Sequence, residues 1–233
     1  MNLILRDLVI KNEFSLINLL KKVEEANKLG ITRLVIAPAY FDEESKSSIE
    51  EVKTIVDDLN RYLDEEKVDL KLYSASLLRD NFENINAFLD GKLGSINESK
   101  YVLLDVAESN TINELLEIIY EFNLRNYVPV IVSPERMPEI IEKSKNIDKL
   151  LNEDCLFQLD IKSINGEYGK KVLKAANFLK KKEIYSFVGY EDNAKREYIT
   201  KDIEAIGKKS LFILLKNDEL KPKPRLKKIK LFN

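Results

Sequence analysis

A strand-like apolar run in the middle of the chain ends in a polar tetrapeptide. Residues 128–132 are apolar, Ser133-Pro134-Glu135-Arg136 follows, and Pro138 stands where a helix could begin. α/β barrels place their chemistry at such strand–loop–helix transitions. The Arg136 guanidinium could grip a phosphate through two parallel hydrogen bonds. It could equally form an ion pair with Glu135 or Asp160 that shapes the mouth of a barrel.

Other charged side chains are expected at or near the ends of further predicted strands. An oxygen-rich set of this kind can hold Mg²⁺ or Mn²⁺, but the same residues can cap helices or lie in solvated loops, which we favour for Asp192. Lys195 and Arg196 could contact an anion or form the solvated first turn of a helix. The carboxylates in question are Asp7, Asp105, Glu135, Asp160, Glu191 and Asp192.

The composition narrows the possible chemistry. The 233 residues include no histidine, the commonest metal ligand and the usual general base, and only 7 glycines, with no phosphate-binding glycine motif. The single cysteine, Cys155, excludes an internal disulfide framework and a cysteine-rich zinc site. With no histidine to activate it, we expect a buried thiol.

A net charge of −2 gives no global attraction to nucleic acid. No apolar run is long enough to enter a membrane and no signal peptide is recognisable, so we expect a cytoplasmic protein.

Strands and helices are predicted to alternate along the chain. Helix starts are indicated at Ser15, at the capping boxes Ser48–Glu51 and Thr111–Glu114, and after Pro138, while 210–215 is ambiguous. Unbroken, even alternation predicts a parallel α/β protein and favours a barrel over an open doubly wound sheet. The predicted strands are 3–10, 31–37, 68–75, 101–106, 127–133, 156–161 and 184–189, and the other predicted helices are 82–89, 168–181 and 195–206.

The last thirteen residues have a different character from the rest. Residues 221–233 contain six basic and no acidic side chains, which leaves 32 basic and 40 acidic residues in the remainder. We therefore predict one barrel domain over residues 1–220 and a basic tail over 221–233. The tail could be an anion-binding arm anchored by Leu226, Ile229, Leu231 and Phe232, and the interpretation we favour is that it lies across the acidic body.

Five short motifs, in order and in register, resemble one family. They are Gly30-Ile-Thr-Arg-Leu-Val-Ile-Ala-Pro-Ala-Tyr40, Ser99-Lys-Tyr-Val-Leu-Leu-Asp105, Tyr127-Val-Pro-Val-Ile-Val-Ser-Pro-Glu-Arg136, Leu156-Phe-Gln-Leu159 and Gly166-Glu-Tyr-Gly-Lys-Lys171. The chain is similar to the PHP (polymerase and histidinol phosphatase) family, in the branch of manganese-dependent tyrosine phosphatases associated with bacterial capsule and exopolysaccharide genes. The resemblance implies a distorted (β/α)7 TIM-like barrel.

The resemblance also implies where metal ions would bind. Family members hold up to three metal ions, mostly through histidines, and use them to activate a water that attacks phosphotyrosine. This chain lacks every one of those histidines, and alanine or leucine cannot ligate a metal. Tyr40 and Tyr190 are expected to fill space that ligands vacated. The family's ligand positions fall on Leu5, Asp7, Ala39, Tyr40, Leu77, Ser133, Tyr190 and Asp192.

Three functions remain open from the sequence. The first is a pseudophosphatase without metal or cofactor, which binds a tyrosine-rich kinase tail or a catalytic paralogue and regulates polysaccharide synthesis. The second is an active phosphoesterase with a new carboxylate site for Mn²⁺ or Mg²⁺. The third is a scaffold whose barrel mouth is inert and whose interface lies on the helices and the basic tail.

Overall fold

The computed structural model describes residues 2–5, 13–40, 47–107, 111–190, 200–201 and 203–207. Its strands are β1 (Asn2–Leu5), β2 (Arg33–Ile36), β3 (Lys71–Ser74), β4 (Leu77–Arg79), β5 (Tyr101–Asp105), β6 (Val128–Val132), β7 (Leu156–Asp160) and β8 (Tyr185–Tyr190). Its α-helices are α1 (Glu13–Lys28), α2 (Ile49–Glu65), α3 (Phe82–Leu89), α4 (Ile112–Leu124), α5 (Pro138–Glu142), α6 (Ile161–Ile164) and α7 (Lys170–Lys181). Short 3₁₀ turns are η1 (Ile96–Glu98), η2 (Pro134–Arg136) and η3 (Ser144–Lys149).

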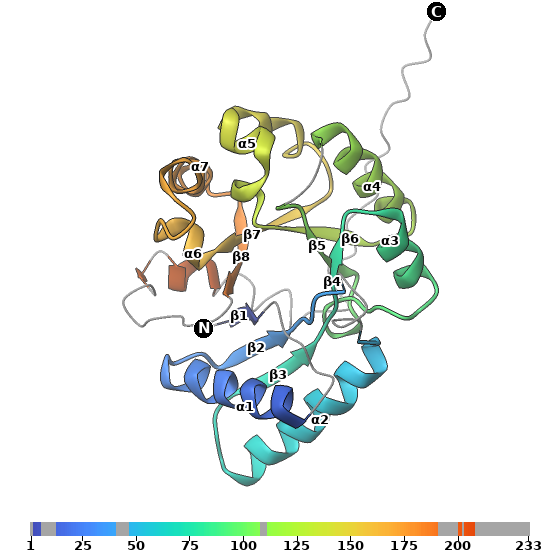
Figure 1. Ribbon diagram of the computed structural model, residues 1–233, viewed down its shortest axis with the longest axis vertical. Helices are drawn as coiled ribbons and strands as arrows, with labels where there is room; N and C mark the ends of the chain where they lie inside the picture. Colours follow the sequence, from blue (N-terminus) through green and yellow to red (C-terminus); the bar gives the residue numbers. More distant parts are fainter. Residues whose placement is uncertain are drawn as a thin grey trace, which may run out of the picture.

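All neighbouring strands pair in parallel, in the order β3-β2-β1-β8-β7-β6-β5-β4. The sheet closes on itself at β4, the last strand in this order. Ala39, just after β2, forms a parallel bridge with Leu77 of β4. The Leu77 amide donates to the Pro38 carbonyl at 2.9 Å, and the Tyr40 amide donates to the Leu77 carbonyl at 3.2 Å. The sheet therefore runs round into a barrel, and Figure 1 shows the helices on its outside.

The predicted third strand, 68–75, corresponds to β3, and a further short strand that was not predicted, β4, follows after Ala75 and Ser76. β3 pairs in parallel with β2, and β4 forms a parallel bridge with the continuation of β2 at Ala39. Taken as one broken strand, they give seven barrel strands, as the sequence predicts. The predicted strand 3–10 is described only at Asn2–Leu5, and 210–215 lies outside the described residues.

Local signals explain where several helices begin. Ser48 and Glu51 form the reciprocal capping box predicted for α2, with the Ser48 amide donating to the Glu51 carboxylate at 2.7 Å. Thr111 caps α4 by accepting from the Glu114 amide at 3.2 Å. α1 begins two residues before the predicted cap at Ser15, and Gly30 follows it at φ 77°, the left-handed conformation expected after a helix end.

Alternation along the strands separates two apolar cores. One set of side chains points outward and packs under the helices. The other set points into the barrel and fills it, which is why the strands read as continuous apolar runs. The inner set comprises Val35, Ala37, Ala39, Ala75, Leu77, Ile96, Tyr101, Leu103, Val128, Val130, Val132 and Phe187.

Candidate functional site at the barrel mouth

Two neighbouring positions at the barrel mouth, one just after β2 and one in β4, are hydrocarbon. Ala39 and Leu77, bridged to each other, are 5% and 0% exposed and belong to the apolar core inside the barrel. Tyr40 is half-buried and packs against the outer core instead. Neither Ala39 nor Leu77 has a donor atom, so this side of the mouth offers a cation no ligand from its side chains. We call Ala39 and Leu77 the apolar half of the mouth.

The other half, which follows β6 and β7, carries polar groups. Ser133 is fully buried and adopts the left-handed conformation (φ 53°, ψ 48°), so the chain turns sharply into η2. Glu135 is also fully buried: its Oε1 accepts from the Asp160 amide at 2.9 Å, and its Oε2 accepts from the Tyr185 hydroxyl at 2.9 Å. We call Ser133, Glu135, Arg136 and Asp160 the polar half of the mouth.

Burial dominates the electrostatics of Glu135. Desolvation, reinforced by the negative charge of Asp160, raises the pKa of Glu135 to about 7. Burial and the neighbouring Glu135 charge raise the pKa of Tyr185 well above its ordinary value, which keeps its hydroxyl a donor. Glu135 is therefore an internal hydrogen-bonding group of the fold, not a ligand that faces the mouth as the sequence predicted.

Arg136 extends from this buried layer toward solvent. Its Nη1 lies 3.6 Å from Oδ2 of the fully buried Asp160, and its guanidinium carbon lies 4.3 Å above the centre of the Tyr168 ring. The other carboxylate oxygen of Asp160 accepts from the Lys162 amide at 2.8 Å and caps α6. Arg136 thus forms one of the two ion pairs considered from the sequence, the one with Asp160.

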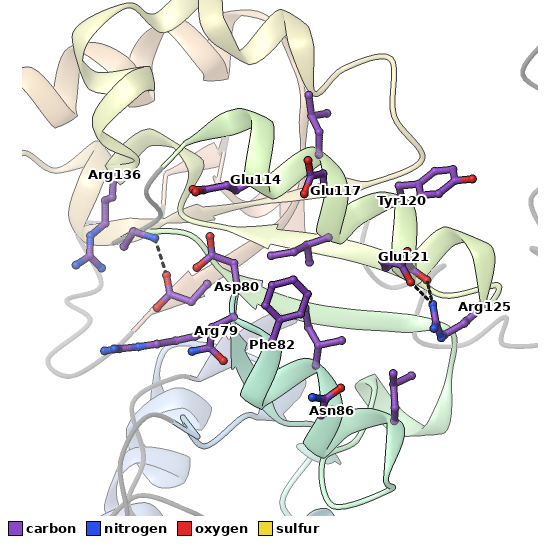
Figure 2. Close-up of a pocket in the computed structure, with 17 residues that line it drawn as sticks. Arg79, Asp80, Phe82, Asn86, Glu114, Glu117, Tyr120, Glu121, Arg125 and Arg136 are labelled. Carbon is purple, nitrogen blue, oxygen red and sulfur yellow. Dashed lines mark hydrogen bonds and ion pairs between the residues drawn. The ribbon is translucent and has the colours of Figure 1, made fainter. Parts of the chain in front are cut away.

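A cavity of about 1140 Å³ opens from the polar half of the mouth and runs between α3 and α4. Figure 2 shows Arg79 and Arg136 at the same end of it, while Arg125 lies at the other end. Asp105, at the end of β5, lines the cavity and accepts from the Ala107 amide at 2.9 Å. The two guanidinium groups, with the carboxylates of Asp80 and Asp105 in the same lining, form a surface that can bind an anion at the mouth.

The structure does not reach every predicted site residue. Asp7, Glu191, Asp192, Lys195, Arg196 and the tail 221–233 lie outside the described residues, as do the side chains of Leu5 and Tyr190. Cys155 is described and half-buried, its Sγ lies 3.6 Å from the Leu150 carbonyl, and burial raises the pKa of its thiol to about 12. This pKa keeps the thiol protonated at neutral pH, which disfavours it as a nucleophile, while its partial exposure differs from the buried thiol that the sequence predicted.

Sequence reasoning missed three residues of the site. Arg79 ends β4, a strand that was not predicted, and the rule that strand ends carry polar chemistry would have found it once β4 was recognised. Tyr185 and Tyr168 contact Glu135 and Arg136 from 50 and 32 residues away along the chain. Neither tyrosine carries a local signal, because tertiary packing alone creates these contacts.

We compared the described residues with what a metal centre of the family requires. No group of three or more histidine, cysteine, aspartate or glutamate side chains that could hold a metal ion occurs in the described part of the chain. At the positions of the family's ligands, Ala39 and Leu77 contribute hydrocarbon and Ser133 is sealed from solvent. These residues do not fit a metal centre of the family type.

Comparison with known proteins identifies the family of this chain. A family model described as "Capsular polysaccharide synthesis, CpsB/CapC" matches residues 14–210. The chain is 27% identical to the putative tyrosine-protein phosphatase CapC of Staphylococcus aureus over 158 residues, covering 68% of this chain and 61% of CapC. It is 25% identical to the tyrosine-protein phosphatase YwqE of Bacillus subtilis over 202 residues, covering 84% of this chain and 80% of YwqE. The chain thus spans less than two thirds of the length of the CapC relative.

A solved structure agrees with the fold. It comes from a crystallographic study of YwqE from Bacillus subtilis and CpsB from Streptococcus pneumoniae, described as metal-dependent tyrosine phosphatases. The TM-score is 0.67 at 23% identity, with 82% of this chain and 77% of the other covered. Within the described residues no helix is long and apolar enough to span a membrane. From the match over 197 of its 233 residues, the chain belongs to the CpsB/CapC family, whose phosphatase members have the PHP-type barrel.

Proposed function

We propose that this chain is a pseudophosphatase, which binds a phosphorylated tyrosine-rich segment of a partner at the barrel mouth and does not hydrolyse it. The observation that supports the proposal is the apolar half of the mouth. Ala39 and Leu77 stand where the resemblance places metal ligands, and both are packed into the barrel core. A packed core stabilises the fold without metal, so the barrel can persist after its reaction is lost.

The missing chemistry is specific. In the related phosphatases, metal ions would supply charge neutralisation and an activated water for attack on phosphorus. No histidine is present to replace them as a general base. Glu135, with a pKa near 7, has a value suited to proton transfer, but it is fully buried and both its oxygens are engaged inside the protein.

The retained chemistry suits binding of an anion. Arg79 and Arg136 meet at one end of the cavity, where a phosphate dianion would find two forked donors. Contact with Tyr168 and Asp160 restricts the Arg136 side chain, so less conformational entropy is lost when it binds a ligand. By analogy with relatives named as tyrosine phosphatases, the ligand we propose is phosphotyrosine within a kinase tail, in a pathway of capsule or exopolysaccharide synthesis.

Loss of hydrolysis is tested on the full chain purified in the presence of Mn²⁺. We expect less than one tenth of a metal ion per chain and no p-nitrophenyl phosphate hydrolysis above that of an Asp105→Ala variant. Stoichiometric manganese, together with hydrolysis that Asp105→Ala abolishes, would establish an active enzyme with a carboxylate centre and overturn the proposal.

Binding is tested by titrating the same protein with a tyrosine-rich peptide in phosphorylated and unphosphorylated form. We expect a preference of at least ten-fold for the phosphorylated form, lost in Arg79→Ala and reduced in Arg136→Lys. Lysine is chosen at position 136 because it keeps a positive charge beside the buried Asp160. Arg61→Ala is the matched control, since Arg61 is an exposed arginine on α2 paired with Asp58. Equal binding of the two peptides, unchanged in both mouth variants, would exclude phosphate recognition.

A further inference from the structure

The surface between α3 and α4 carries an unusual share of exposed apolar side chains. Seven large apolar residues are exposed in the described part of the chain, and four of them belong to these two helices. Phe82 is 77% exposed and Tyr120 is 52% exposed. The four are Phe82 and Leu89 on α3, and Tyr120 and Leu124 on α4; Phe82, Leu89 and Tyr120 also line the cavity described above. Solvated apolar surface gathered in one place marks a binding surface.

Acidic residues border this apolar surface. Glu114, Glu117 and Glu121 recur at intervals of three and four along α4, so they share one face of the helix, and all three line the cavity. Asp80, two residues before α3, adds a fourth carboxylate, and Figure 2 shows it opposite Glu114 and Glu117. Arg125 pairs with Glu121 at 2.6 Å and offsets part of this charge. We call this surface the α3–α4 groove.

The chain itself contains a segment of the complementary chemistry. The tail 221–233 has six basic side chains and no acidic ones. Leu226, Ile229 and Phe232 recur every third residue between the lysines, a spacing that presents them together if the segment becomes helical on binding. Helix-in-groove recognition uses this arrangement of apolar anchors between charged side chains.

The tail is long enough to reach the groove. Gly207 is the last described residue, and 26 residues follow it in the sequence. The eighteen residues 208–225, which precede the first apolar anchor Leu226, can span about 60 Å when extended. The whole barrel is about 45 Å across for a compact chain of this length. Length therefore does not prevent contact between the tail and the groove of the same molecule.

From these observations we propose that the α3–α4 groove is a docking site for the basic tail 221–233 of the same chain. Leu226, Ile229 and Phe232 fill the space between Phe82 and Tyr120, and the lysines face the glutamates of α4. This docking goes beyond phosphotyrosine binding and does not depend on it.

The test uses the full chain with its own tail disabled by Leu226→Ser, Ile229→Ser and Phe232→Ser. A fluorescein-labelled peptide of residues 221–233 is titrated into this triple variant. We expect saturable binding that weakens as NaCl is raised from 50 to 500 mM. Wild-type chain should bind the peptide at least ten-fold more weakly, because its groove is already filled.

Groove variants in the same background identify the surface. Glu117→Lys and Tyr120→Ser should each weaken peptide binding at least ten-fold. Ile17→Ser is the matched control: Ile17 is 50% exposed on α1, and its loss should change nothing. Peptide binding that is absent, or unaffected by both groove variants, would overturn the proposal.

Two further readouts separate the remaining outcomes. If wild-type chain sediments as a dimer that the triple tail variant converts to monomer, the tail docks on a second copy, and docking within one chain is wrong. Phosphopeptide affinity of Glu117→Lys and Tyr120→Ser, measured alongside, should match that of the triple variant. Failure of tail docking can thus be told apart from failure of phosphotyrosine binding.

Discussion

The two halves of the barrel mouth differ in the side chains that fill their buried positions. In the apolar half, Ala39 and Leu77 extend the core of the barrel up to its rim. In the polar half, Glu135 and Asp160 are just as deeply buried but keep their carboxylates, supported by Tyr185, Arg136 and backbone amides. The apolar half of the rim is part of the core, and the polar half is a hydrogen-bonded network.

This difference separates two roles that a polar residue can have at a barrel mouth. A metal ligand stabilises the fold only while a metal is bound, and hydrocarbon can take its place where no metal binds. A carboxylate that accepts backbone amides and a buried hydroxyl is part of the fold, and its removal leaves donors unsatisfied. The motif Pro134-Glu135-Arg136 is therefore explained by its structural contacts, whether or not Arg136 also binds a phosphate.

The largest effect is expected when a carboxylate is placed in the apolar half of the mouth, because this tests directly how the two halves differ. Leu77→Glu puts a charge into a fully buried apolar site, and we expect the free energy of unfolding to fall by more than about 3 kcal/mol. Urea denaturation at pH 7 measures this loss. Leu77→Met is the volume-conserving control and should cost less than about 1.5 kcal/mol. If Mn²⁺ restores the stability of Leu77→Glu, the mouth still holds a metal site and the apolar half is misinterpreted.

The next test concerns pH and the polar half. The pKa of Glu135 is about 7 in the folded protein and near 4.5 when unfolded, so the folded state binds the proton more tightly. The stability contributed by the neutral carboxyl is complete below pH 4.5 and is lost as pH rises through 7, by up to about 3 kcal/mol. Unfolding free energies measured from pH 4.5 to 8.5 should fall accordingly.

Glu135→Gln isolates this contribution. A neutral amide can accept from the Asp160 amide and donate to the Tyr185 oxygen, so the network survives without a titrating group. We expect the variant to lose most of the decline between pH 4.5 and 7 and to be more stable than wild type at pH 8. A decline of unchanged size in Glu135→Gln would assign the pH dependence to other groups.

A smaller effect is expected for Tyr185→Phe. The change removes the buried hydroxyl that donates to Glu135 Oε2 at 2.9 Å. We expect a loss of about 2 kcal/mol at pH 8, where Glu135 is charged, and about 1 kcal/mol at pH 5. Tyr62→Phe on the exposed face of α2 is the control and should have no measurable effect. A loss that does not depend on pH would show that the hydroxyl and the Glu135 charge are uncoupled.

The smallest effect concerns Gln158 of β7, two residues before Asp160. Its amide is fully buried, and neither of its polar atoms has a hydrogen-bond partner in the structure. Gln158→Met keeps the volume and removes the amide, so we expect the unfolding free energy to be unchanged or to rise by up to about 1 kcal/mol. Thermal denaturation measures it, and a loss above about 2 kcal/mol would indicate that the amide is satisfied.

Most of the fold could be predicted because local signals agree with one another. Capping residues Ser48 and Thr111, and apolar runs such as 101–105 and 128–132, define the elements directly. The strand β4 was not predicted, because the predicted third strand ended at Ala75. The break between β3 and β4 depends on how Ala75 and Ser76 meet Ile36 and Gly94 in space, which the local sequence does not encode.

The site was predicted less completely than the fold. Arg136 was recognised from its place after a strand, and its link to Asp160 was one of two partners considered. Glu135 was expected at the mouth, and only tertiary contacts with Tyr185 and Asp160 show that it is enclosed. Arg79 was missed because its strand was missed. Contacts between residues far apart in the sequence leave no periodic or motif signal in a single chain.

The Ala39–Leu77 bridge has a consequence for how the protein opens. At this bridge β4 pairs with the segment that follows β2, and so with the part of the chain that contains β1, β2 and β3. In the described residues, two backbone hydrogen bonds join β4 to that segment. Elsewhere in the described residues that part is held to the barrel by the β1–β8 pairing at two residue pairs, by the Ile49 amide, which donates to the Lys92 carbonyl at 2.8 Å, and by the exposed Lys53–Glu98 ion pair at 2.7 Å. Local unfolding occurs where few hydrogen bonds must break. In native-state hydrogen exchange, we therefore expect β1 to β3 with α1 and α2 to open as a cooperative unit at lower free energy than β5 to β7.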